Sequence, residues 1–196
     1  MRLSSSNRIG YALAAMITFV ICSFNSIREC SMEISLINST SVKIKGKNAS
    51  LVIDPTAKQD ADIIIATKPL EALAVDKIDG VRLVIAGPGE YEAGGISITG
   101  KSSKGSVLYN IIDSSRIMFV TSNGIASVPD DEEYDCLLIE VVGELKEDAF
   151  ASINAKCVVL FGDLMNVTVT DEKKETTSKV NIKKTAEIAG KIFFLA

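Results

Sequence analysis

The side chains that could do chemistry in this sequence are carboxylates, lysines and cysteines, because the chain contains no histidine. Without an imidazole base, a Ser-His-Asp or Cys-His triad cannot form. The four cysteines include no Cys-x-x-Cys pair, so they do not predict a thiolate metal site. Hydrolytic zinc needs several fixed N, O or S donors and an open coordination position, and in this chain no imidazole can be one of those donors.

Carboxylates remain as possible oxygen ligands for a hard cation such as Ca²⁺ or Mg²⁺. No Asp-x-Asp-x-Asp-Gly loop organises them, so we interpret them as ordinary surface charges and expect no metal or other cofactor. The candidates are Glu71, Asp76, Glu90, Glu92 and Asp163.

Short apolar or alternating runs separated by turn residues predict strands through most of the chain after Met32. In the second half, the stretches 144–155 and 183–190 have helical spacing between apolar runs, which indicates βα units packed on a sheet. The polar stretch 168–179 has no periodicity and is predicted to be an exposed, mobile loop. The predicted strands are 33–37, 41–47, 50–55, 62–67, 81–87, 95–100, 106–112, 116–121, 136–142 and 157–161.

The composition is that of one folded domain, with 47% apolar and 23% charged residues in 196 positions. The net charge of −4 and the absence of a basic cluster interleaved with aromatics disfavour nucleic-acid binding. Cys136 and Cys157 lie in apolar runs, so we interpret them as buried free thiols in a reducing compartment.

An uncharged apolar run covers residues 9–24 and divides the chain into a segment 1–31 and a domain 32–196. The run is short for a spanning helix of about twenty residues, and no Ala-x-Ala cleavage pattern follows it. Two interpretations stay open: a short apolar helix that anchors the chain in a membrane, or an upstream extension of a chain that starts at Met32. The first predicts a membrane-tethered domain and the second a cytoplasmic one.

The glycine-rich segment GPGEYEAGGISITG, residues 87–100, provides sharp turns between strands where a Cβ would clash. We interpret it as structural and not as a phosphate site, because no helix follows and no Lys-Ser/Thr completes a P-loop. The segment resembles one in the L-ascorbate-6-phosphate-lactonase-like, Zn-dependent hydrolase-like branch of the metallo-β-lactamase superfamily. The order of the strands from Met32 to Phe161 is also similar. This resemblance implies an α+β or α/β fold in which a sandwich of β-sheets is flanked by helices.

The family's zinc ligands have no counterparts at the corresponding positions. Its Thr-His-x-His-x-Asp-His motif falls on residues 67–73, where only Thr67 is retained. The resemblance places its bridging aspartate at about Ser122 and its last histidine at about Gly162. The vacated positions are Lys68, Leu70, Ala72, Leu73, Ser122 and Gly162.

Lys68 has two interpretations. Its ammonium could take the place of the metal charge, paired with Asp54 or a nearby carboxylate. Alternatively it is a solvated surface lysine, which the usual exposure of lysine favours.

The function predicted from these residues is that of a non-catalytic pseudo-hydrolase acting as a binding or assembly module, with a homo-oligomer as one form of assembly. The alternative is a metal-free or altered-chemistry hydrolase that uses Lys68 as a base. A pocket lined by Lys68, Glu90 and Tyr91 would favour the hydrolase. A site filled by Leu70 and Leu73 would favour the binding module.

Overall fold

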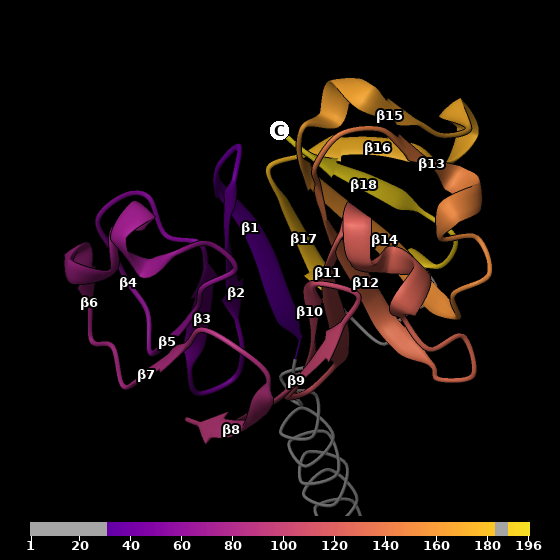
Figure 1. Cartoon of the computed structure of the whole chain (residues 1–196). Coiled ribbons are helices and arrows are strands. Elements are labelled where there is room, and N and C mark those ends of the chain that lie inside the picture. The colour runs from indigo at the N-terminus through magenta and orange to yellow at the C-terminus, as the bar shows by residue number, and fades with distance from the viewer. Residues whose placement is uncertain (1–30, 183–187) are drawn as a thin grey trace, which may run out of the picture.

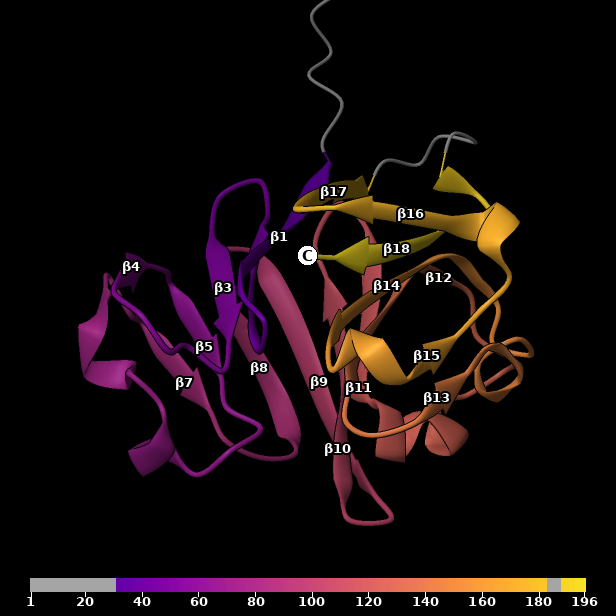
Figure 2. The ribbon, with the colours of Figure 1, turned by 90° about the horizontal axis from the view of Figure 1, so that it is seen from above.

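The structure is a computed structural model that describes residues 31–182 and 188–196. In these ranges two large β-sheets pack face to face, and Figure 1 shows them as a left-hand, indigo-to-magenta layer and a right-hand, mostly orange layer. The view from above in Figure 2 shows the same two layers, with β9 and β10 of the second sheet near the middle of the view. The predicted segment 1–31, its apolar run 9–24 included, lies outside the described residues except for its last position.

The first sheet has six strands in the order β17-β1-β2-β3-β5-β7. Its outer members on one side pair antiparallel, whereas β3, β5 and β7 run parallel to one another. The strands are β1 (Met32–Asn38), β2 (Ser41–Lys45), β3 (Ser50–Ile53), β5 (Ile63–Ile65), β7 (Leu83–Ile85) and β17 (Lys179–Ile182).

The second sheet has eight strands in the order β16-β18-β14-β12-β11-β10-β9-β8. It is parallel from β16 to β11 and antiparallel from β11 to β8. The strands are β8 (Gly89–Ala93), β9 (Ile96–Ser103), β10 (Ser106–Ile112), β11 (Arg116–Thr121), β12 (Tyr134–Val141), β14 (Ala155–Gly162), β16 (Lys174–Thr177) and β18 (Ile192–Leu195).

Short elements connect the main strands. Two small parallel pairs join β4 (Gln59–Asp60) to β6 (Ile78–Asp79) and β13 (Leu145–Lys146) to β15 (Val167–Thr168). The helices found in the described ranges are 3-10 turns: η2 (Leu70–Ala72), η3 (Val75–Lys77), η4 (Ser122–Ser127), η5 (Glu147–Ala149), η6 (Leu164–Asn166) and η7 (Asp171–Lys173).

The main core lies between the two sheets and takes alternate residues from each strand. In β12, Cys136 and Leu138 belong to this core, whereas Leu137 and Ile139 face a second core on the outer side of the same sheet. The alternation follows from the two-residue period of a strand, and it assigns each position of β12 to one face. Glu140 therefore falls on the face between the sheets.

All ten predicted strands are present, 106–112 and 116–121 with the predicted ends and the others with shifted ends, but the predicted helix over 144–155 is wrong. Leu145 is in β13, paired with Val167, and Phe150 is buried against the second core after the short turn η5. The apolar residues of this stretch are therefore buried one by one, through a short strand and a turn, and not along one face of a helix. For the second predicted helix, residues 183–187 lie outside the described ranges, and the remainder forms a turn before β18.

The predicted loop over 168–179 is also wrong in part. It contains β16 and leads directly into β17, and these strands form the outermost members of the two large sheets. The predicted Gly94-Gly95 turn is confirmed, since both residues have positive φ, 60° and 84°, between β8 and β9. No helix within the described ranges is long and apolar enough to cross a bilayer.

Candidate functional site

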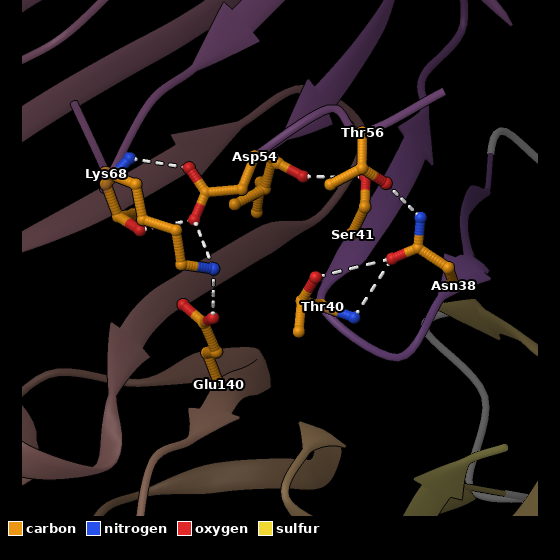
Figure 3. Close-up of polar contacts among 9 residues, drawn as sticks. Asn38, Thr40, Ser41, Asp54, Thr56, Lys68 and Glu140 are labelled. Carbon is orange, nitrogen blue, oxygen red and sulfur yellow. Dashed lines mark hydrogen bonds and ion pairs between the residues drawn. The ribbon is translucent and has the colours of Figure 1, made fainter. Parts of the chain in front are cut away.

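Lys68 joins the two sheets through a pair of carboxylates. Its Nζ atom lies 3.2 Å from Oδ2 of Asp54 and 2.9 Å from Oε1 of Glu140 (Figure 3). The lysine side chain is 40% exposed, whereas those of Asp54 and Glu140 are 0% and 4% exposed. The predicted ion pair of Lys68 with Asp54 is therefore confirmed, and the lysine is partly solvated but not unpaired.

Asp54 is held by the backbone turn that follows β3. Its φ of +45° is left-handed, a conformation that Asp tolerates better than most residues. Its carboxylate accepts hydrogen bonds from the amide of Thr67 at 2.7 Å and from the hydroxyl of the same residue. Because β3 and β5 are parallel neighbours, the residues that follow both strands meet at one edge of the sheet.

Glu140 comes from the second sheet and was not identified from the sequence. It is opposite Thr121 in β11 and Phe161 in β14, on the face between the sheets. The signal was a single acid inside the apolar run CLLIEVV. A carboxylate buried in a strand requires a charged or hydrogen-bonding partner, but the sequence could not say that the partner is Lys68, which is 72 positions away.

The electrostatics of this cluster keep Lys68 protonated. Burial alone would lower the pKa of Lys68, but the hydrogen bond and negative charge of Glu140, followed by the charge of Asp54, raise it above the ordinary value. Burial raises the pKa of Glu140, and the Lys68 ammonium opposes that rise. A lysine whose pKa is raised is a poor general base at neutral pH.

A cavity of about 340 Å³ opens beside Lys68 and Glu140. Its lining comes from the ends of β5, β7, β11 and β12, from β10 and the turn before it, and from η4. The polar lining side chains include Thr67, Ser106, Thr121 and Asn123, and Val107, Tyr109 and Val142 contribute apolar surface. Neither Glu90 nor Tyr91 lines it, and neither Leu70 nor Leu73 fills it, so neither of the two arrangements set out from the sequence is present.

Two of the six positions aligned with zinc ligands have a structural role in the backbone here. The hydroxyl of Ser122 donates to the carbonyl of Val142 at 2.9 Å and accepts from its amide at 3.0 Å. Gly162 has a φ of +100°, and a Cβ there would lie 2.6 Å from the carbonyl oxygen of Val141. Any side chain at this position, a histidine included, would require the backbone to move.

The remaining aligned positions follow β5 in and beside η2. Leu70 is 41% exposed, Ala72 is also exposed, and Leu73 is half-buried. None of these three lines the cavity beside Lys68.

The other sequence candidates do not converge on that cavity. Glu90 lines a separate groove of about 490 Å³ on the opposite face of the second sheet, together with Lys101 and Arg116. The hydroxyl of Tyr91 donates to the carbonyls of Gly87 and Pro88, both at 3.2 Å. Within the described ranges, no three His, Cys, Asp or Glu side chains are grouped so that they could hold a metal ion. The carboxylates in question belong to different elements: Glu71 to η2, Asp76 to η3, Glu90 and Glu92 to β8, and Asp163 to the turn after β14.

Cys136 and Cys157 are buried free thiols, as predicted, and they occupy paired positions of β12 and β14. Burial, followed by the neighbouring Cys157, raises the pKa of Cys136 well above its usual value. Both side chains belong to the main core, and the raised pKa of Cys136 makes that thiol a poor nucleophile.

Comparison with known proteins identifies the fold by structure and not by sequence. No protein-family model matches the chain, and no curated protein matches it in sequence. A protein of Thermotoga maritima assigned as a Zn-dependent hydrolase of the metallo-β-lactamase superfamily has a similar structure, with a TM-score of 0.60 at 16% identity. The match covers 83% of this chain and 98% of that one, so the two share the fold.

Two further structures are less similar. The metallo hydrolase Igni18 of Ignicoccus hospitalis matches at a TM-score of 0.45 and 11% identity, over 67% of this chain and 82% of that one. A diphosphatase of the PhnP family matches at a TM-score of 0.45 and 13% identity, over 72% of this chain and 82% of that one.

Proposed function

We propose that this chain is a non-catalytic member of the metallo-β-lactamase fold, derived from its Zn-dependent, L-ascorbate-6-phosphate-lactonase-like branch, and that it acts as a binding or assembly module. The observation that carries the proposal is the position of Lys68, whose ammonium lies between Asp54 and Glu140 at the strand ends. A fixed positive charge there compensates the carboxylates that a cation would otherwise neutralise.

The absence of histidine also supports the loss of catalysis. The hydroxyl of Ser122 is engaged by the backbone of Val142, and Gly162 has no side chain that could hold a metal. The raised pKa of Lys68 argues against the alternative, a metal-free hydrolase with Lys68 as its base.

Metal content and turnover, measured on one preparation, test the loss of catalysis. The full chain is purified without chelator, and bound Zn, Mn and Fe are determined per chain beside phosphodiesterase and lactonase assays. We expect near-zero metal and no turnover above a chelator-treated control.

Stoichiometric metal that is lost in the variants Asp54→Asn and Glu140→Gln would contradict the proposal, because carboxylates would then hold a working ion. The assembly form of the proposal has its own measurement, sedimentation velocity over a range of concentrations. A monomer at every concentration would leave ligand binding as the role of the domain.

A further inference from the structure

The cavity beside Lys68 has polar groups that the protein itself leaves unused. Among the described residues, no partner accepts from or donates to the side chains of Ser106, Thr121 or Asn123, all of which line the cavity. Lys68 has three N–H groups and two carboxylate partners, so one donor remains free. These groups face the solvent-accessible cavity without a partner in the described part of the chain, so they are available to hydrogen-bond a ligand that enters it.

The charges of the site select against anions. Lys68 and Glu140 are the charged side chains among the lining residues, and Asp54 lies directly behind Lys68. One ammonium therefore faces two carboxylates, so no positive charge is left over for a phosphate or a carboxylate of a ligand. The cluster therefore carries a net charge of −1, which disfavours an anionic ligand.

The free groups include both donors and acceptors, which suits hydroxyl groups. A hydroxyl both donates and accepts, as do those of Ser106 and Thr121, and the amide of Asn123 offers one group of each kind. Val107, Val142 and the ring of Tyr109 supply apolar surface for the carbon skeleton of a ligand. Burial raises the pKa of Tyr109 to about 12, so its hydroxyl remains neutral.

We propose that this cavity binds a small neutral molecule rich in hydroxyl groups, a monosaccharide or a cyclic polyol. Its volume of about 340 Å³ lies at the lower end of the range of about 300–1,000 Å³ that is usual for small-molecule sites. The inference rests on the proposed function and gives the binding module a class of ligand.

The experiment is a titration of the ¹⁵N-labelled full chain with glucose and with myo-inositol, followed by NMR at concentrations that detect millimolar affinity. We expect saturable shifts at the amides of residues that line the cavity. The variants Thr121→Val and Asn123→Ala each remove one hydrogen-bonding group and should weaken binding about two- to tenfold.

Matched controls come from the separate groove on the other face of the sheet. Thr99→Val makes the same change there as Thr121→Val, Ser102→Ala removes a further polar side chain of that groove, and both should leave the affinity unchanged. Absence of saturable shifts with both probes would overturn the inference. So would tighter binding of glucose 6-phosphate than of glucose, because the site would then select an anion.

Metal content separates this inference from the proposed function. A metal-free chain that binds neither probe contradicts only the polyol site. A chain that binds a polyol but holds a stoichiometric, catalytically active metal contradicts only the loss of catalysis.

Discussion

At the scale of single residues, Lys68 separates two carboxylates that would otherwise face each other inside the protein. Lys68→Met removes the charge but keeps most of the side-chain length. Truncating one partner of a buried ion pair costs about 3–5 kcal/mol, and the 40% exposure of Lys68 reduces this through solvent screening. We expect the free energy of unfolding to fall by about 2–3 kcal/mol at neutral pH in urea denaturation.

The matched control is Lys58→Met. Lys58 forms a 3.6 Å pair with Asp79 in which both side chains are more than 70% exposed, at 77% and 72%. Such a surface pair contributes little, so its loss should change stability by less than about 0.5 kcal/mol. Equal effects of the two substitutions would mean that Lys68 is no more than a surface charge.

The pH dependence of Lys68→Met follows from Glu140. Burial already raises the pKa of Glu140 in the folded protein, and loss of the opposing Lys68 raises it further. A carboxyl with a raised folded pKa favours the folded state below its ordinary value of 4.5, and this advantage is lost as pH rises through the folded pKa. The deficit of the variant should therefore be smallest below pH 4.5 and largest at neutral pH.

At the scale of elements, Ser122 extends the pairing of β11 and β12 beyond the end of the backbone ladder. Ser122→Ala removes both hydrogen bonds to Val142. Because Val142 is partly solvated, at 48% exposure, we expect a loss of about 1–2 kcal/mol in the free energy of unfolding. Faster hydrogen exchange of the Val142 amide should accompany it.

Ser127→Ala is the control for this prediction, since Ser127 belongs to the same turn η4 and makes no hydrogen bond through its side chain among the described residues. It should leave both the stability and the Val142 amide unchanged. An unaltered exchange rate in Ser122→Ala would show that the hydroxyl does not hold the strand end.

Glu147 ties the turns η5 and η7 together. Hydrogen bonds from the Lys173 ammonium, and then from the amide and hydroxyl of Thr170, lower the pKa of Glu147 to about 2. The stabilisation is present above its ordinary value of 4.5 and is lost as pH falls toward 2. A ¹³C titration of the full chain should place the midpoint of Glu147 near 2.

Lys173→Met should raise that midpoint toward 4.5, because it removes the first of these partners. Lys146→Met is the control, since Lys146 pairs with Glu144 at 3.2 Å and not with Glu147. A midpoint that stays unchanged in Lys173→Met would contradict the assignment of the shift to this ion pair.

Some secondary-structure elements could be predicted from the sequence and others could not. Apolar runs such as 136–142 predicted strands correctly, because burial on both faces leaves a continuous apolar signature. The edge strand β16 was missed, since its residues are polar and exposed and its stability comes from backbone pairing with β18. The helical spacing in 144–155 was overridden when Leu145 joined β13 and Phe150 entered the second core.

At the scale of the whole molecule, the site depends on which sheets face each other. The sequence indicated Asp54 and Lys68, which follow neighbouring parallel strands, but Glu140 reaches them only because β12 packs across from the first sheet. No local pattern encodes that distance. The residues that each sheet contributes to such a site can be noticed in a sequence, but their contact can be predicted only from the packing of the two sheets.

Thiol labelling of Cys136 and Cys157, which are 0% and 1% exposed, reports whether the main core is folded. In a Cys22→Ser/Cys30→Ser background, a thiol reagent should label these two cysteines together and only through global unfolding. Slowing of at least about 10³-fold relative to the denatured chain is expected for an ordinary domain stability. Lys68→Met should speed the labelling of both thiols equally if opening and closing are fast relative to modification. Rapid labelling of one thiol alone would instead mean that β12 or β14 opens locally, and that Lys68 does not couple the two sheets into one cooperative unit.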